Sequence, residues 1–151
     1  MNDVAIVLDC TVLPINKPGG SLMNCKKFYS GKHHIYCVNV EVGVNPAVGT
    51  ACTISFVHTG STHDFTVFKE HCPLFKDQLK GSKIQADSAY IGAKPELDAI
   101  ITQLVGTQEL ASKRVIVERF FGRLKTLFPV FRRQWPFEPD RISDYFIVAC
   151  Y

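Results

Sequence analysis

The chain has 151 residues, of which 46% are hydrophobic and 21% charged, the composition of one globular domain with a substantial core. No apolar run approaches the roughly 18 residues that a membrane helix needs, and the opening residues, MNDVAIVLDC, lack the basic segment of a signal peptide. The net charge of +3 excludes no partner by itself. We therefore expect a soluble protein that is not secreted and has no membrane partner.

A strand followed by a carboxylate opens the chain. Residues 4–8 form an apolar run that suits the interior of a sheet, and Asp9 follows them. A carboxylate at the end of such a strand is costly unless it is paired or binds a metal ion. An aspartate in a turn before Thr11 explains the residue equally well.

Two further strands are predicted after a loop over residues 16–32, which is rich in Pro, Gly, Ser and Lys. Residues 34–44 alternate, with valines on one face and Glu41 on the other. Residues 50–58 form the next strand, with Phe56 on one of its faces. Three sequential strands joined by loops predict an antiparallel meander.

A short helix is predicted after the sequence GSTHD at residues 60–64. Ser61, with Asp64 three residues later, resembles a capping box, and Pro73 closes the helix. Helix capping is therefore a strong alternative to any site role for Asp64. The three histidines of this region match no metal-ligand spacing, and the six cysteines of the chain include no Cys-x-x-Cys pair. We expect ordinary polar roles for the histidines and reduced, buried thiols.

The fourth predicted strand covers residues 83–87 and, like the first, ends in an acid, Asp87. Ligands of open α/β sheets bind outside the carboxyl ends of the strands, so Asp87 stands where a site is expected. A helix is predicted from Pro95, with Gly106 as its stop.

Residues 114–125, RVIVERFFGRLK, are predicted to form an amphipathic helix, because their apolar residues recur at i, i+3, i+4 and i+7. Glu118 is the only acid of this helix, and an exposed ion pair with Arg114 is its simplest role. Gly122 costs the helix roughly 1 kcal/mol relative to alanine and would let another group approach closely. The alternative role for Glu118 is a site on which other carboxylates converge.

The last third of the chain is basic, with eight basic residues against three acids between residues 110 and 141. This balance fits a polyanion partner, although a solvated helix face gives a similar count. Arg132, Arg133 and Trp135 follow Pro129 as a basic-aromatic loop, in which the indole either stacks on an unpaired base or is buried. Residues 145–151 are predicted to be helical.

Asp9, Asp87 and Glu118 form a candidate metal site. The first two have no basic residue beside them in their own strands, and three carboxylates suit a hard divalent cation. Two such ions can activate a nucleophile and stabilise the leaving oxygen in phosphoryl transfer. A basic surface nearby would hold the phosphate backbone.

Four stretches stand in order along the chain: LDCTVLPI around Asp9, YSGKHHIYCVNVEV from Tyr29, GSTHDFTVF around Asp64, and ADSAYIG with RVIVERFFGRLK. Together they resemble the catalytic domain of DDE transposases of the PIF/Harbinger type and of their bacterial insertion-sequence relatives. The resemblance covers most of the chain, and the segment VERFFGRLK is its most telling part.

The resemblance implies a ribonuclease H-like α/β fold, in which a mixed sheet, a three-strand antiparallel meander plus a further strand, is flanked by helices. It implies a Mg²⁺ or Mn²⁺ site and gives catalytic and metal-binding roles to Asp9, Asp87 and Glu118, with Asp64 adjacent to the site. DNA is the implied partner. The candidate DNA-binding residues are Arg114, Arg119, Arg123, Lys125, Arg132, Arg133 and Trp135.

These features predict a metal-dependent DNA endonuclease and strand-transfer domain of a transposase, a single domain over residues 1–151. The alternative is a degenerate or domesticated scaffold that binds DNA or a protein partner without catalysis. No helix-turn-helix precedes Asp9 and the chain ends inside a helical segment, so we expect truncation at both ends. A separate DNA-binding protein or domain, or a second copy of the chain, would then assist it, in the nucleus of a eukaryote or otherwise in the cytoplasm.

Overall fold

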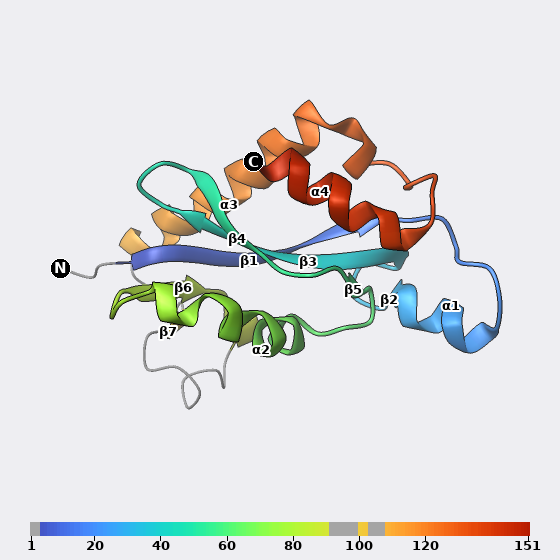
Figure 1. The fold of residues 1–151 in the computed structure, drawn as a ribbon, viewed down its shortest axis with the longest axis horizontal. Coiled ribbons are helices and arrows are strands. Elements are labelled where there is room, and N and C mark those ends of the chain that lie inside the picture. Colours follow the sequence, from blue (N-terminus) through green and yellow to red (C-terminus); the bar gives the residue numbers. More distant parts are fainter. Residues whose placement is uncertain (1–3, 91–99, 103–107) are drawn as a thin grey trace.

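A mixed β-sheet forms the centre of the molecule in the computed structural model, which describes residues 4–90, 100–102 and 108–151. Within those residues the sheet has seven strands in the order β2-β3-β1-β6-β7, with β4 and β5 also paired to β3 (Figure 1). The strands are β1 (Val4–Pro14), β2 (Tyr29–Ser30), β3 (Ile35–Asn45), β4 (Thr50–Ile54), β5 (His58–Thr59), β6 (Lys83–Ala86) and β7 (Ile100–Thr102). The helices are α1 (Leu22–Phe28), α2 (Asp64–Phe75), α3 (Gln108–Leu127) and α4 (Ile142–Cys150).

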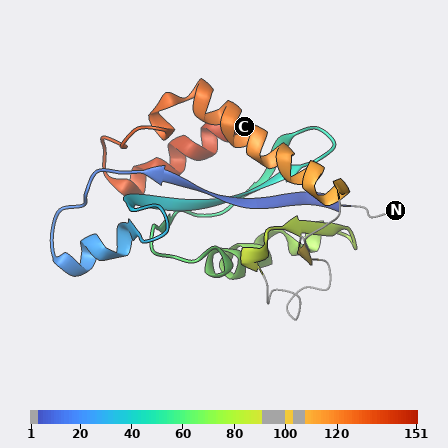
Figure 2. The same cartoon turned by 180° about the vertical axis from the view of Figure 1, so that it is seen from behind.

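The strand directions confirm the predicted meander and the mixed α/β class. β3 is antiparallel to both β1 and β4, whereas β6 is parallel to β1 and β7 is parallel to β6. α3 and α4 cover one face of the sheet and α2 lies against the other (Figures 1 and 2). None of the helices in the described residues is long and apolar enough to cross a membrane.

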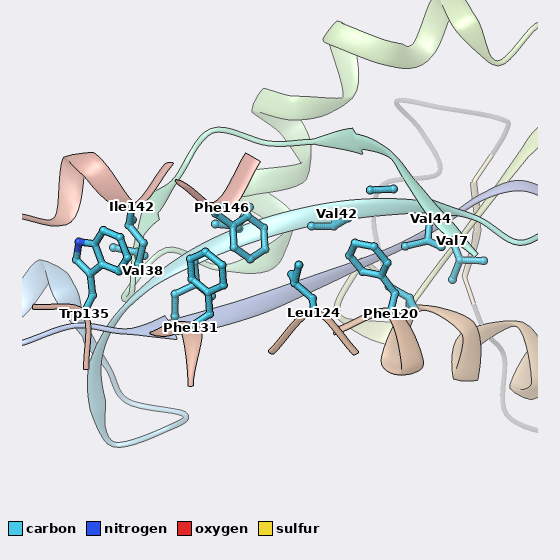
Figure 3. Close-up of a cluster of buried hydrophobic side chains, with 14 of the residues drawn as sticks. Val7, Val38, Val42, Val44, Phe120, Leu124, Phe131, Trp135, Ile142 and Phe146 are labelled. Atoms are coloured by element: carbon cyan, nitrogen blue, oxygen red, sulfur yellow. The ribbon is translucent and has the colours of Figure 1, made fainter. Parts of the chain in front are cut away.

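Two apolar clusters fill the space between the sheet and its helices. On the α3 and α4 face, Phe120 and Leu124 of α3 and Phe146 of α4 pack on the valines of β3 (Figure 3). On the α2 face, Ile6 and Leu8 of β1 pack with a second cluster. Each fully buried side chain of this size contributes about 1.5–3 kcal/mol to folding. The predicted stripe of the 114–125 helix is therefore the face that α3 packs on the sheet.

β1 and β4 differ in length from the predicted strands. β1 continues five residues beyond Asp9 because Asp9 to Pro14 pair with β3, so the acid stands inside the strand. β4 stops at Ile54, and the chain does not form a strand again until β5. The break turns Phe56 outward, where 71% of it is exposed.

The first two helices also differ from expectation. The predicted loop over residues 16–32 contains α1, whose N-terminus is capped by the Ser21 hydroxyl accepting a hydrogen bond from the Asn24 amide. The N-cap of α2 is His63 without a side-chain hydrogen bond, so the expected Ser61 capping box is wrong. Pro73 lies inside α2 and does not end it, since the helix runs on to the buried Phe75.

The predicted helix of residues 95–106 falls mostly outside the described residues. Its one described part, Ile100–Thr102, is β7, parallel to β6. A short apolar run cannot be assigned to a strand or a helix by periodicity alone. The later predictions hold: α3 ends at Leu127, just before Pro129, and α4 covers most of the final apolar segment.

Candidate functional site

The register of the parallel pair brings two of the predicted acids to one place. Val7 of β1 pairs with Gln85 of β6. Asp9 and Asp87 each lie two residues beyond that pair, and β6 has ended at Ala86. The pairing of β1 with β6 therefore sets Asp9 and Asp87 at the same level of the sheet, where a parallel neighbour of β1 stops.

Arg114 of α3 connects Asp87 with Glu118. Its Nη2 atom lies 3.2 Å from Asp87 Oδ2, and its Nε atom lies 3.3 Å from Glu118 Oε1. The ion pair predicted as the simplest role of Glu118 is thus present, at the i,i+4 spacing of a helix. The same guanidinium reaches Asp87, which follows β6, so α3 supplies a basic group to an acid that has none beside it in its own segment.

Burial dominates the electrostatics of Asp9. The pKa of the Asp9 carboxyl is raised to about 6, chiefly by burial and to a smaller extent by the neighbouring charges of Asp87 and Asp64. The Cys10 amide, which donates a 2.9 Å hydrogen bond to Asp9 Oδ1, and the charge of Arg114 lower it. The charges of Asp87 and Asp64 therefore both disfavour ionisation of Asp9.

A groove of about 1010 Å³ runs along this part of the sheet. Asp9, Asp64 and Asp87 line it together with Arg114. Glu118 is not among the lining residues and reaches the acids through Arg114. Among the residues that the structure describes, no three His, Cys, Asp or Glu side chains lie close enough to hold a metal ion. The side chain of Glu118 is 55% exposed.

The loop that carries Asp64 is fixed by Gly60. A Cβ atom on Gly60 would lie 2.5 Å from the Phe28 carbonyl oxygen and 2.6 Å from that of Cys37. The Ser61 amide also donates a 3.0 Å hydrogen bond to the Lys27 carbonyl. The glycine of GSTHD thus permits a close backbone approach that presents the first turn of α2 to the groove. Gly122 has no such contact, because open space surrounds it.

Sequence reasoning missed a buried polar network on the α2 face. Glu41 is fully buried and accepts two hydrogen bonds of 2.7 Å, from His71 Nδ1 and from the Tyr90 hydroxyl. The other ring nitrogen of His71 lies 2.7 Å from the Thr53 hydroxyl, and Cys10 Sγ lies 3.4 Å from the Tyr90 hydroxyl. Burial raises the pKa of Tyr90 well above its usual value, so the hydroxyl keeps its proton.

This network touches both acid-bearing segments. Cys10 follows Asp9 directly, and the Tyr90 amide donates a 3.0 Å hydrogen bond to the Asp87 carbonyl. Through the Tyr90 hydroxyl, which contacts both Glu41 and Cys10, the network therefore connects the backbone after β6 with the middle of β1 on the α2 face of the sheet. An acid within an apolar alternating strand was the signal in the sequence, because such a residue is rarely buried without partners.

Several of the predicted DNA-binding side chains are held by the protein itself. Lys125 donates to the Val12 carbonyl at 3.0 Å, and burial lowers its pKa. Arg123 contacts the Gly49 carbonyl, and Arg132 the Thr126 hydroxyl. Arg119 and Arg133 are exposed.

The prediction that Trp135 binds DNA is wrong. Trp135 is only 2% exposed and its indole N–H donates to the Glu138 carbonyl, so it belongs to the core and is not positioned to stack on a base. Its rings pack on Phe131, Phe137 and Tyr145. Of the three residues that defined the predicted basic-aromatic loop, only Arg132 and Arg133 are therefore exposed.

The other residues that could have formed a metal site also have ordinary roles. All six cysteines are free thiols; Cys25, Cys37 and Cys72 are buried, and Cys52 is exposed. His58 lies 3.7 Å from Glu70, and His71 belongs to the buried network. The two histidine contacts agree with the polar roles expected from the sequence, whereas the expectation of buried thiols is wrong for Cys52.

Comparison with known proteins gives one family match. The model of a family described as DDE superfamily endonuclease matches residues 8–151, nearly the whole chain. No curated protein and no solved structure matches the chain. The matched range includes each of the four acids discussed above.

Proposed function

The chain belongs to the DDE superfamily endonucleases, and from that premise we propose that it is a metal-dependent nuclease and strand-transfer domain of a transposase. In this proposal it has a ribonuclease H-like fold of the PIF/Harbinger type. Its catalytic carboxylates are Asp9, Asp87 and Glu118, and its substrate is a DNA phosphodiester.

The proposal rests on the observation that Asp9 and Asp87 lie at the same level of the sheet, beside the groove. Two acids far apart in the sequence come to the same end of a parallel strand pair, and a third, Asp64, lines the same groove. Burial, together with the charges of Asp87 and Asp64, raises the pKa of Asp9 to about 6. Perturbed carboxyls that gather in a groove are typical of functional sites.

The carboxylate oxygens of these acids are chemically suited to a hard divalent cation. Carboxylate oxygens are the ligands that Mg²⁺ and Mn²⁺ prefer, and a cation would relieve the repulsion among the acids around Asp9. Asp9, Asp87 and Glu118 would be the residues that hold the cation. When bound, such ions make water a stronger acid and stabilise the leaving oxygen of a phosphodiester. Hydrolysis would free a 3′-hydroxyl that can attack target DNA.

The protein's own residues have separate tasks in this proposal. Asp9 and Asp87 are held in place by the sheet, whereas Glu118 is exposed and held by Arg114. Arg114 neutralises the acids in the absence of a cation and, once released, can contact a phosphate of the DNA. No Ser, Cys or His nucleophile is required, and the Cys10 thiol, whose pKa burial raises well above its usual value, is unsuited to that role.

Nicking of a labelled DNA duplex in Mg²⁺ or Mn²⁺ tests the proposal. Wild type should nick and EDTA should abolish nicking. Asp9→Asn should fall to background, because the change keeps the shape of the side chain and removes its charge. Asp77→Asn, an exposed acid away from the groove, is the matched control and should nick normally. A folded Asp9→Asn protein that nicks as well as wild type contradicts the assignment.

A second candidate is a scaffold that binds DNA or a protein partner without cutting. Arg114 favours it, because its ion pairs occupy two of the three proposed metal ligands. Wild type that binds DNA but does not nick it in Mg²⁺ or Mn²⁺ supports this reading. DNA is the proposed partner in both cases, alongside a DNA-reading protein or domain or a second copy of the chain, and the nucleus is the proposed location in a eukaryote.

A further inference from the structure

The groove continues well beyond the acids. From Asp9 onward, the described residues of β1 pair only with β3, so the opposite edge of the strand is left to form a wall of the groove. Tyr29, Lys32 and His33, in and after β2, line its far end, and His63 at the start of α2 lies on its side. The groove therefore joins the acids to a turn that sequence reasoning left out of the site.

The groove carries both acids and N–H donors. Its lining includes the acids Asp9, Asp64 and Asp87. Lys32 and His33 follow β2, His63 directly precedes Asp64, and all three are exposed and offer N–H donors. A chain of phosphates whose reacting phosphodiester lies at the acids would need such donors for its neighbouring phosphates.

Asn39 provides an acceptor at the floor of the groove. Its side-chain Nδ2 donates a 2.9 Å hydrogen bond to the Thr62 carbonyl, which fixes the orientation of the amide. Asn39 lines the groove and is only 5% exposed. Its Oδ1 atom is buried and accepts no hydrogen bond from the described residues. A buried acceptor without a donor is costly, and the N–H groups of a nucleobase edge are donors of the kind it lacks.

Tyr29, which also lines the groove, adds an aromatic surface. The side chain is 39% exposed, and its ring packs edge-on against Tyr36 with centroids 5.3 Å apart, which limits its movement. Exposed aromatic rings next to a basic groove are the usual platform for unpaired bases. Bases inside a duplex present neither their faces nor their pairing edges, so these two features together favour an unpaired strand.

We propose that this groove binds one unpaired DNA strand, which runs from the acids to the turn that carries Lys32 and His33. Lys32, His33 and His63 hold its phosphates, Tyr29 stacks on a base, and Asn39 accepts a hydrogen bond from a base edge. The inference rests on the proposed action on DNA, and it moves the strand from the outer face of α3, where Lys125 and Arg123 bond to the protein's own backbone, to the groove.

Binding of a fluorescent single-stranded oligonucleotide, measured against salt in EDTA, tests the groove without metal-dependent cutting. Lys32→Ala should weaken binding about three- to fivefold and make the log–log salt slope shallower by about 0.7, the value for one released counterion on a single strand. Lys76→Ala, another exposed lysine far from the groove lining, is the matched control. It should bind like wild type.

Two aromatic variants test the stacking. Tyr29→Leu should weaken binding fivefold or more, the effect expected of one stacked base. Tyr151→Leu, which changes a tyrosine that is 80% exposed at the chain end, should leave binding unchanged. Asn39→Ala should also bind more weakly, and thermal melting must first show that each variant is folded.

Affinities of Lys32→Ala and Tyr29→Leu equal to those of their controls overturn the groove assignment, as does wild type that binds no single strand or prefers intact duplex. The outcomes separate this inference from the nuclease proposal. Wild type that binds through the groove but does not nick refutes the nuclease alone. Wild type that nicks, with groove variants that bind normally, refutes the groove alone.

Discussion

The two halves of β1 belong to one strand but have different neighbours. Val4 to Val7 pair with the parallel strand β6, and their side chains enter the apolar clusters on both faces of the sheet. From Asp9 onward the strand pairs with β3, and the residues up to Val12 line the groove. The change occurs at the end of β6.

This difference teaches that the end of a neighbouring strand can separate core from site within one strand. The apolar side chains of the first half stabilise the fold because folding removes their surface from contact with water. The second half carries Asp9 and Cys10 and is supported from below by the polar network around Glu41. Four changes test that contrast, in decreasing order of expected effect.

Removing the support from the second half should have the largest effect. Glu41→Ala should lower the free energy of unfolding by about 3–5 kcal/mol, because it leaves His71 and Tyr90 buried without their acceptor. Urea denaturation at neutral pH measures it. Glu41→Gln, which keeps an oxygen for one donor, should lose less than Glu41→Ala. Losses below about 1 kcal/mol for both would mean that the network does not support β1.

The loop beside the second half should tolerate no side chain at Gly60. Gly60→Ala should cost about 2–3 kcal/mol, since its Cβ would meet two backbone carbonyls that cannot rotate away. Gly31→Ala, where open space surrounds the new methyl group, is the matched control and should change stability little. Equal melting temperatures for the two variants would contradict the close approach at Gly60.

The charge of Asp9 should reduce stability in the metal-free protein. A folded-state pKa of about 6, above the unfolded value, means that stability is fully present at low pH and falls as the pH rises through about 6. Asp9→Asn should therefore be more stable than wild type by about 1–2 kcal/mol at pH 7 and equal to it near pH 3. Urea denaturation in EDTA across this range measures the difference. A constant difference at all pH values would refute the assignment of the shift to Asp9.

Arg114 should have the smallest effect. Arg114→Gln removes the cation that pairs with Asp87 and Glu118, so Mn²⁺ should bind about three- to fivefold more tightly, the gain expected from a partly exposed ion pair of about 1 kcal/mol. Calorimetric titration measures it. Arg119→Gln changes a neighbouring exposed arginine and should leave affinity as in wild type. Weaker binding by Arg114→Gln would mean that Arg114 orders the acids and does not compete with the cation.

Hydrophobic periodicity and the ends of strands allowed much of this fold to be predicted from the sequence. The valine alternation gave β3, the i, i+3, i+4 stripe gave the buried face of α3, and the acid at the end of β6 was placed correctly. These features depend on local pattern alone. The Arg114–Glu118 ion pair was also predictable from local spacing. The neighbour of Asp9 and the contact of Arg114 with Asp87 depend on the register of distant segments, so the sequence could supply candidates for them but no geometry.

The failures have physical causes of the same kind. Trp135 stands among arginines in the sequence, yet its ring is buried by Phe131 and Tyr145 from other segments. Pro73 ends helices locally, yet the burial of Phe75 keeps the last turn of α2. The contribution of Tyr29 and Lys32 to the groove was missed because only the fold brings β2 and the turn after it to the acids.

Mn²⁺ binding tests the central claim, that the acids where β6 ends form a divalent-cation site, without requiring DNA. Free Mn²⁺ is measured by electron paramagnetic resonance in titrations of wild type, Asp9→Asn and the exposed control Asp77→Asn. The account predicts binding by wild type and the control, and affinity at least tenfold weaker in Asp9→Asn, about 1.4 kcal/mol or more. Wild type that binds no Mn²⁺, or Asp9→Asn that binds it as tightly as wild type, contradicts the account.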